Sequence, residues 1–215
     1  TVIIAVFGLI IGFIIGSIVA VIKEIPTYKN PILKIIQRIG DLYVTIFRGT
    51  PMVVQLLIIH FVLFPAMRIQ FKNLIITQNF SLQGVVIEAI IAFALNSGAY
   101  MSEIMRGGIS SIDKGQLEAG RALGLSYPKT MVSVVLPQAF KNVLPTLGNE
   151  FIALIKETSV VSFIAVTDLT KAFQNIANST YEFIIPYLVL ALCYLVLVIL
   201  ISILVKFLEK KLKKA

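Results

Sequence analysis

Five long apolar blocks dominate this sequence and limit what it can fold into. They cover residues 1–22, 39–64, 82–105, 142–166 and 183–207. A helix that crosses the hydrocarbon core of a bilayer needs roughly 20 predominantly apolar residues. The first and last blocks meet that requirement without interruption, while the middle three carry interior polar residues. The pattern predicts an all-α, polytopic membrane protein with about five transmembrane helices in a single domain, 1–215.

Composition argues against the other fold classes. The chain is 58% hydrophobic and 14% charged, whereas soluble domains are nearer half apolar and a quarter charged. A membrane β-barrel alternates apolar and polar residues, but residues 188–200 are almost continuously apolar. The single cysteine, Cys193, excludes an internal disulfide and a cysteine metal cluster, so we expect no metal site. The first block has no basic region ahead of it, which argues against a cleavable signal peptide, and we expect that a few residues precede it in the complete protein.

The basic residues are concentrated in three segments between or after the apolar blocks. The net charge is +8, and 14 of the 19 basic residues lie in these segments. They are Lys23, Lys29, Lys34 and Arg38, then Arg106, Lys114, Arg121, Lys129 and Lys141, then Lys206, Lys210, Lys211, Lys213 and Lys214. Loops on the cytoplasmic side of a membrane carry such an excess. The distribution predicts a multi-pass protein of a prokaryotic plasma membrane with its N-terminus outside and its C-terminus in the cytoplasm, and nucleic acid is not needed to explain the charge.

The loop at about 107–140 is too long for a simple connection between two spans. Connections of this length are usually functional or disordered, and this one has the signals of two short helices. Residues 111–113 can cap a helix over 117–123, and Gly124 is a natural C-terminal stop. Pro128 opens a second amphipathic segment, which we expect Pro137 to end. The loop therefore predicts either a docking surface for another protein, where Ala119 and Gly120 allow close approach, or an interfacial helix lying on lipid.

The same loop carries a set of residues at fixed spacing. They are Glu118, Ala119 and Gly120, then Gly124, then, after nine intervening residues, Val134, Val135, Leu136 and Pro137. This spacing closely resembles the signature loop of ABC-importer permeases, which runs Glu-Ala-Ala, three residues, Gly, nine residues, Ile, one residue, Leu-Pro. The chain departs from that pattern only at Gly120 and Val134, and both are small changes in size. The resemblance implies that this loop is a coupling helix docked on an ATPase.

Further motifs resemble the polar amino-acid uptake subfamily of these permeases. They are residues 47–51 with Gln55, then Tyr100, Glu103 and residues 106–108, then residues 156–159. The resemblance implies a five-helix permease, usually a dimer and here favoured as a homodimer, with a cytoplasmic ABC ATPase and an extracytoplasmic amino-acid-binding protein as partners. No phosphate loop of the form G-x-x-x-x-G-K-[ST] occurs in the chain. We therefore expect ATP and Mg²⁺ on the partner ATPase, no cofactor on this chain and no enzymatic activity of its own.

Polar residues inside the predicted spans are the candidates for a substrate site, because ionisable groups in a membrane are costly. In the third span Asn96, Tyr100 and Glu103 lie on one helical face. In the fourth span Glu157 follows Glu150 by seven residues, so the two acids share a face. Carboxylates would bind the ammonium group of an amino acid, and donors such as Tyr100 and Asn96 would bind its carboxylate.

Alternatives remain open for each of these residues. Glu103 can pair with Arg106 at i, i+3, and Lys156 can pair with a carboxylate across a dimer. Ser159 is a further candidate donor for the substrate carboxylate. Because Glu103 is expected near the inner boundary of the membrane and Glu157 further out, the two acids would bracket a cavity rather than hold one group.

Isolated features carry weaker predictions. Thr50-Pro51 interrupts the second block, where a plain kink is the expected result. Gln55 either lines the pathway or bonds to a neighbouring helix. His60 is expected to bond to a neighbour rather than to a metal, and Asp168 and Glu182 are exposed candidates for contact with a binding protein.

The predicted function is the permease subunit of an ATP-driven importer for polar, favoured as basic, amino acids. Several intramembrane carboxylates favour a cationic substrate, and glutamine is the alternative because a zwitterion also needs an acid for its ammonium group. Two other classes compete with this function: a stand-alone carrier or channel that relays protons, and a membrane scaffold that transports nothing. Carriers often contain internal repeats, and we find no clear one here.

Overall fold

The computed structural model describes residues 1–25, 30–77 and 80–212, so Lys29, Lys213 and Lys214 lie outside the described residues. Its long helices are α1 (Val2–Glu24), α2 (Pro31–Gly49), α5 (Gly84–Ser110), α8 (Leu136–Glu157) and α10 (Ile184–Leu212). The shorter helices are α3 (Met52–Ile58), α4 (Phe64–Ala66), α6 (Lys114–Ala122), α7 (Tyr127–Thr130) and α9 (Leu169–Thr180). Two π-helical turns, η1 (Ile59–Leu63) and η2 (Met131–Val135), and one 3₁₀ segment, η3 (Thr158–Ile164), complete the helical part. The all-α fold is confirmed, with one addition, the antiparallel hairpin of β1 (Leu74–Thr77) and β2 (Phe80–Leu82).

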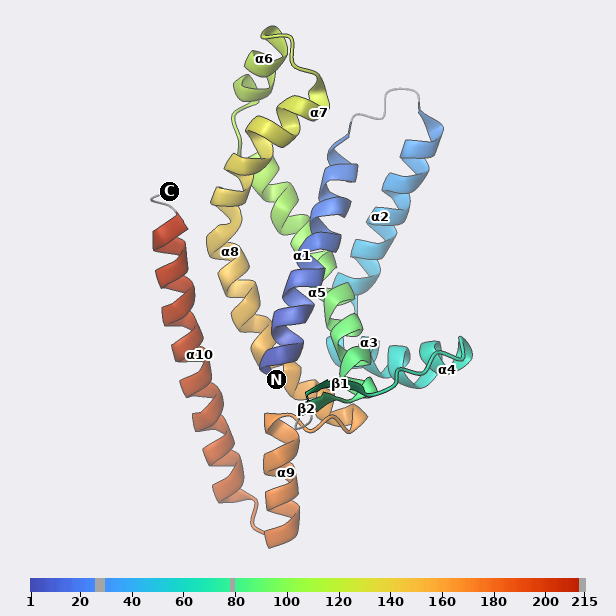
Figure 1. Cartoon of the computed structure of the whole chain (residues 1–215), viewed down its shortest axis with the longest axis vertical. Coiled ribbons are helices and arrows are strands. Elements are labelled where there is room, and N and C mark those ends of the chain that lie inside the picture. Colours follow the sequence, from blue (N-terminus) through green and yellow to red (C-terminus); the bar gives the residue numbers. More distant parts are fainter. Residues whose placement is uncertain (26–29, 78–79, 213–215) are drawn as a thin grey trace.

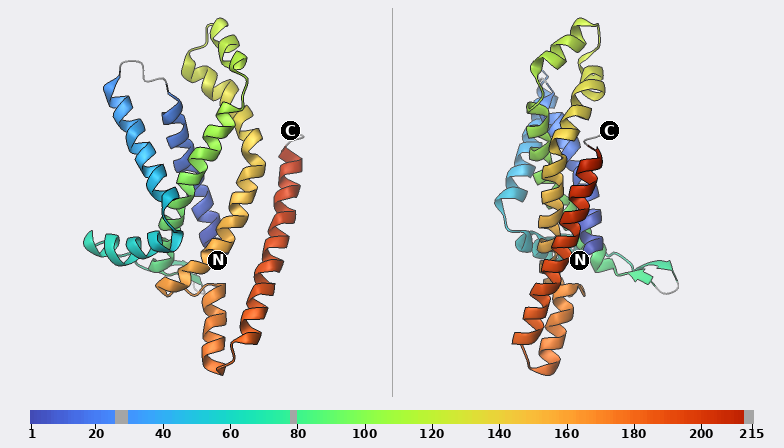
Figure 2. Two further views of the ribbon diagram at one scale, coloured as in Figure 1. Left: turned by 180° about the vertical axis from the view of Figure 1, so that it is seen from behind. Right: turned by 90° about the vertical axis from the view of Figure 1, so that its left-hand side faces the viewer.

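The long helices run side by side as a bundle (Figures 1 and 2). In the described ranges α1, α5 and α10 are each long and apolar enough to cross a membrane, and the bent pair of α2 with α3–α4 adds a fourth candidate. Helix α8 has 22 residues, which corresponds to roughly 33 Å and so matches the bilayer core in length. Its polar residues make it less apolar than the span candidates α1, α5 and α10. The C-terminal end of α1, the loop with α6 and α7, and the C-terminal end of α10 point toward the same end of the bundle (Figure 1).

Helices α1 and α5 form the closest pair in the bundle. Gly8, Gly12 and Gly16 follow one face of α1 and are buried against α5. A Cβ atom added at Gly12 would lie 2.8 Å from Ser97 Cβ and 3.0 Å from the backbone nitrogen of Gly98. The two backbones approach this closely because α1 has glycines at the contact, and small residues at helix interfaces are a common packing mode of membrane helices.

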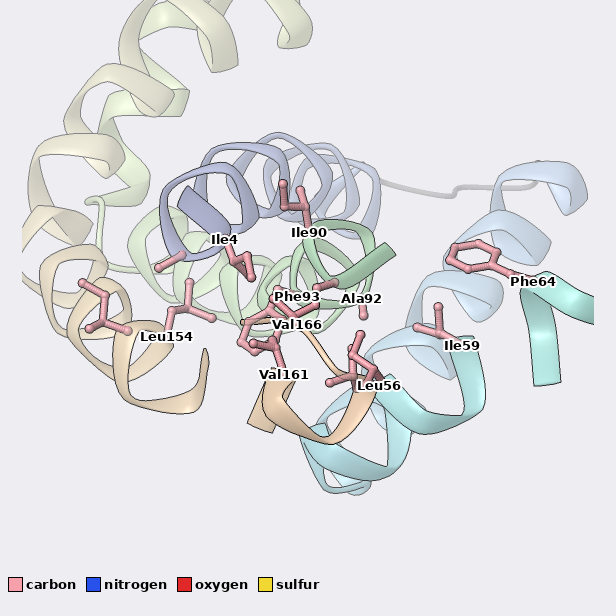
Figure 3. Close-up of a cluster of buried hydrophobic side chains, with 14 residues drawn as sticks. Ile4, Leu56, Ile59, Phe64, Ile90, Ala92, Phe93, Leu154, Val161 and Val166 are labelled. Carbon is pink, nitrogen blue, oxygen red and sulfur yellow. The ribbon is translucent and has the colours of Figure 1, made fainter. Parts of the chain in front are cut away.

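The apolar core lies where α1, α5 and α8 meet the segments that run across the bundle. Phe93 from α5 is fully buried beside Leu56 from α3 and Val161 from η3 (Figure 3). Leu154 from α8 joins the same cluster. The core therefore packs α5, which carries three of the predicted site residues, against α3 and η3.

The second apolar block is broken rather than kinked, which corrects our prediction for Thr50-Pro51. Helix α2 ends at Gly49, and the segment Met52–Ala66 leaves it at a bend of 111°. Thr50 has extended backbone angles, φ −125° and ψ 147°, because proline disfavours a helical residue before it. The Gln55 side-chain amide then donates to the carbonyls of Phe47 (2.7 Å) and Thr50 (2.9 Å), so the break has its own hydrogen bonds.

The fourth block also changes its course before its predicted end. Helix α8 stops at Glu157, and η3 follows up to a left-handed Ala165 with φ 59°. Asp168, which we expected to be exposed, is only 4% exposed. Its carboxylate accepts a hydrogen bond from the backbone nitrogen of Lys171 at 2.8 Å and so caps α9. The exposed role predicted for Asp168 is therefore wrong, because the side chain is used within the fold.

The first half of the long loop folds as predicted. Asp113 caps α6 by accepting from the backbone nitrogen of Gly115, and Gly124 ends the helix at φ +81°. The second half differs from the prediction, because Pro137 does not end its helix: the chain continues from α7 through η2 into α8. The π-helical turn directly before Pro137 accommodates its ring and its missing N–H.

Candidate functional site

Asn96 is bonded inside the bundle at the break between α2 and α3. It is 3% exposed, and its amide donates to Gln55 Oε1 at 2.9 Å and to the carbonyl of Phe47 at 3.3 Å. Gln55 is 6% exposed and bonds back to Thr50. Of the two roles left open for Gln55, the structure shows the hydrogen bond to a neighbouring helix. Asn96 therefore ties α5 to the broken segment.

Glu103 lies about two turns of α5 beyond Asn96 and is the centre of a charged cluster. Its carboxylate accepts from Lys23 Nζ at 3.2 Å and from Arg106 at 2.9 Å, and Arg48 lies 3.7 Å away. Lys23 also pairs with Asp41 at 2.9 Å. The i, i+3 pair of Glu103 with Arg106, one of the two alternatives from the sequence, is present. The cluster also joins residues of α1, α2 and α5, which the sequence alone does not connect.

Tyr100 joins the same cluster through its ring. The guanidinium of Arg48 lies 5.4 Å from the ring centroid, within the range of a cation–π interaction. Tyr100 is 36% exposed and the Arg48 side chain 44% exposed. Together with Arg106 and Asp41, these two residues form the accessible side of the cluster, whereas Lys23 and Glu103 are only partly exposed and form its inner side.

The cluster carries more positive than negative charge. Lys23, Arg48 and Arg106 face Glu103 and Asp41. Such a set can bind both ends of a zwitterion: the partly exposed Arg48 can donate to a carboxylate, and Glu103 has further lone pairs for an ammonium group. The chemistry available here is charge-assisted recognition of a small polar solute.

Glu157 and Ser159 lie in a different segment, at the junction of α8 and η3. Glu157 is exposed and Ser159 partly buried. Among the described residues, no hydrogen bond or ion pair joins either one to Asn96, Tyr100 or Glu103. The structure thus brings the three α5 residues close to one another and leaves Glu157 and Ser159 apart.

The docking-loop candidates are mostly at the surface. Glu118, Ala119, Gly124 and Pro137 are exposed. Gly120, which we expected to open toward a partner, is buried against the Thr130 side chain. Leu136 is partly buried on a small apolar cluster with Ile109, Met131, Val135 and Ala139. Gly120 and Leu136 therefore hold the loop together, and the other four candidates form its accessible face.

Sequence reasoning missed Arg48, Lys23 and Asp41 as members of the cluster. The basic pattern indicates only topology for Lys23, although Lys23 directly follows the first apolar block and Asp41 lies inside the second, where a charge needs a partner. His60, predicted to bond to a neighbour, does so: its Nδ1 contacts Glu88 Oε2 on α5. Within the residues that the structure describes, no group of three or more metal-ligating side chains occurs.

A bundle with a broken second span, a charged cluster inside it and a folded loop at one end defines an α-helical polytopic membrane protein. Residues 8–214 match the family described as "Binding-protein-dependent transport system inner membrane component". The chain belongs to this family of inner-membrane transport components.

Relatives within the family cover nearly all of the chain. The "Putative glutamine transport system permease protein GlnP" of Rickettsia typhi is 41% identical over 207 residues, which are 96% of this chain and 87% of that protein. The "Arginine transport system permease protein ArtQ" of Bacillus subtilis is 40% identical over 210 residues, 98% of this chain and 88% of ArtQ. A solved structure described as "Crystal structure of an amino acid ABC transporter with histidines" is 34% identical with a TM-score of 0.79, over 97% of this chain and 88% of that one.

Proposed function

We propose that this chain is the transmembrane permease subunit of an ATP-driven importer for polar amino acids, with a basic amino acid favoured and glutamine as the alternative. The relatives support the class of substrate, since their names give glutamine and arginine. The observation that carries the proposal is the cluster around Glu103, where a partly buried carboxylate lies next to an accessible Arg48, whose guanidinium lies over the ring of Tyr100.

In this proposal the substrate binds between the accessible and inner sides of the cluster. Arg48 and Tyr100 bind its carboxylate, and Glu103 binds its ammonium group. Asn96 holds the wall of the site through Gln55, while Glu157 and Ser159 contact the solute at a second point further along the pathway. A guanidinium or imidazolium side chain would use the second carboxylate, Glu157, which is the reason that a basic substrate is favoured.

The proposed partners follow from the loop and from the family. A cytoplasmic ABC ATPase docks on the surface of Glu118, Ala119, Gly124 and Pro137, with Gly120 and Leu136 as internal support. ATP and Mg²⁺ bind to that ATPase, so this chain is not itself an enzyme. A second permease subunit, favoured as another copy of this chain, and an extracytoplasmic amino-acid-binding protein complete the transporter, with the N-terminus outside and the loop in the cytoplasm. ATP binding would drive alternating access through the docked loop.

The first test is ligand-stimulated ATPase activity of the purified complex in liposomes. Arginine, histidine and glutamine are compared across wild type, Glu103→Gln and Glu157→Gln, with Lys206→Gln, at an exposed side chain of α10, as the control. We expect the half-stimulating arginine concentration to rise about tenfold in the site variants, because each loses a charge-assisted hydrogen bond, and to stay constant in the control. Wild-type responses from both site variants would exclude these carboxylates as substrate ligands.

The second test addresses the docking surface. Glu118→Lys reverses a charge at the exposed face of α6, and Gly124→Leu adds a side chain where φ is +81°. We expect both variants to hydrolyse ATP without matching uptake, whereas Lys206→Glu, a charge reversal at an exposed side chain of α10, transports normally. Fully coupled uptake by Glu118→Lys would count against the docking role.

A stand-alone carrier is the main competing class. It would accumulate amino acid in liposomes that contain this chain alone, driven by a proton gradient. The ATP-driven importer proposed here shows no uptake without the ATPase subunit, so this single comparison separates the two functions.

A further inference from the structure

The C-terminal end of α1 is bonded to two other parts of the chain. The hydroxyl of Tyr127 donates to the carbonyl of Glu24 at 3.0 Å. The side-chain amide of Gln37, on α2, donates to the carbonyls of Ile22 at 2.9 Å and Ile25 at 2.8 Å. The last carbonyls of a helix have no partner within the helix, and here those partners come from α2 and from the long loop. The position of the end of α1 is therefore set by elements other than α1.

Tyr127 is anchored in the docking loop. It begins α7, and its ring packs on the cluster of Ile109, Met131, Val135 and Ala139. Beside the hydrogen bond lies a cavity of about 340 Å³, which has Glu24, Leu117, Glu118 and Tyr127 in its lining. Glu24 of α1 and these loop residues line one cavity, and the Tyr127 hydroxyl joins the two elements through its hydrogen bond. A movement of the loop would pull directly on the carbonyl of Glu24.

The neighbouring residue in α1 reaches the charged cluster. Lys23 precedes Glu24, and its ammonium group lies 3.2 Å from Glu103 and 2.9 Å from Asp41. The Lys23 side chain is 16% exposed, so its ammonium group has little water to replace a lost carboxylate. One hydrogen bond and one ion pair, on adjacent residues of α1, thus connect the docking loop to Glu103.

We propose that Tyr127 is a positioning residue that couples the docking loop to the substrate site through the end of α1. When the ATPase moves the loop, Tyr127 displaces Glu24, and Lys23 moves off Glu103 and leaves that carboxylate for the substrate cation. In the reverse movement Lys23 returns and competes with the substrate, which favours release. This inference rests on the proposed function, since it takes Glu103 as a substrate ligand and the loop as the ATPase contact.

Tyr127→Phe tests the proposal because it removes the hydroxyl and keeps the ring. In the reconstituted complex, arginine uptake and ATP hydrolysis are measured together. We expect the ratio of uptake to hydrolysis to fall about three- to tenfold, the range by which one lost hydrogen bond changes a two-state equilibrium. The matched control is Tyr181→Phe, at a side chain that is 86% exposed, and its ratio should equal that of wild type. An unchanged ratio in Tyr127→Phe overturns the proposal.

A double-mutant cycle distinguishes coupling from a general loss of stability. Lys23→Met removes the other end of the connection, so the effects of Tyr127→Phe and Lys23→Met on the ratio should be non-additive. Tyr127→Phe and His60→Gln, which alters the separate contact with Glu88, should be additive. Additive effects in the first pair, or a thermal unfolding temperature that falls while the ratio stays constant, would show a structural role only and overturn the coupling.

The two proposals fail in different ways. If wild type shows no ligand-stimulated ATPase activity, the proposed function fails and this inference fails with it. If wild type is coupled and Tyr127→Phe is equally coupled, only the role of Tyr127 is excluded.

Discussion

Helices α1 and α10 are both long, apolar membrane-span candidates, yet they differ in their surroundings. Within its most apolar stretch α1 buries part of its surface in the bundle, while the corresponding stretch of α10 has no buried residue. Helix α1 has glycines at positions 8, 12 and 16 on the face that meets α5. Helix α10 has large side chains all around, for example Leu195, which is 55% exposed. Apolar length predicts that a helix spans the membrane, whereas the spacing of small residues predicts which helix lies inside.

The difference has a functional side, because the charged cluster is formed by α1, α5 and the neighbouring helix α2. Lys23 ends α1, Glu103 and Tyr100 lie on α5, and Arg48 ends α2. A shift of α1 relative to α5 changes the cluster, whereas a shift of α10 does not reach it. We therefore expect substitutions on the α1–α5 contact to affect folding and transport together, and substitutions on α10 to affect neither.

The largest effect is expected for Gly12→Leu. An added Cβ would lie 2.8 Å from Ser97 Cβ and 3.0 Å from the Gly98 backbone, so the two helices must separate. We expect a loss of about 3 kcal/mol of stability, the upper end of the usual cost of overpacking, seen as a lower thermal unfolding temperature of the purified protein. The matched control is Gly107→Leu, because a Cβ at Gly107 meets nothing within 4 Å. Equal losses in both variants would refute the close contact of α1 with α5.

A smaller effect is expected for Asn96→Leu, which keeps the packing of α5 but removes its polar contact. The change leaves Gln55 without its Asn96 partner, and an unsatisfied buried group costs about 1–3 kcal/mol. Asn142→Leu is the control, because Asn142 makes its hydrogen bond to Ser111 in an exposed position. We expect the thermal unfolding temperature to fall more for Asn96→Leu than for Asn142→Leu. A larger fall for Asn142→Leu would show that the hydrogen bond between Asn96 and Gln55 contributes less to stability than the exposed one.

Gly148→Ala tests the contact between α8 and α10. An added Cβ would collide with Val205 Cγ1 on α10, but α10 packs mainly on α8 and α9 and can move outward. We expect a cost of about 1 kcal/mol, below that of Gly12→Leu. Gly40→Ala is the control, since its Cβ would make only an ordinary contact of 3.6 Å with Val19. A cost as large as that of Gly12→Leu would show that α10 is held as firmly as α1.

Much of the fold could be predicted from the sequence because its signals are local. Apolar length predicts the long helices, and Asp113 and Gly124 predict the ends of α6 from capping alone. The errors occur where tertiary contacts decide. Pro51 predicts a kink, but the hydrogen bonds of Gln55 stabilise a complete break. Pro137 predicts a helix end, but the helix continues through the π-helical turn before it.

The candidate site shows the same limit. The face shared by Asn96, Tyr100 and Glu103 follows from helical periodicity. Their partners Gln55, Arg48 and Lys23 come from other helices, which are 41, 52 and 80 positions away in the sequence. The sequence shows that a charged residue in or next to an apolar block needs a partner, but only the packing of the helices shows which residue that partner is.

The smallest effect is expected for Leu195→Ala on α10, compared with the same substitution at Leu154 on α8. Leu154 is fully buried, and Leu→Ala in a core costs about 2–5 kcal/mol. Leu195 is 55% exposed, and lipid tails are as apolar as leucine, so truncation there forfeits little packing; we expect a change below about 0.5 kcal/mol in thermal unfolding of the isolated chain. The assembled transporter sharpens the comparison. If Leu195→Ala becomes costly only in the complex, another subunit covers α10 there, and the exposed face of this helix is an assembly surface rather than a lipid contact.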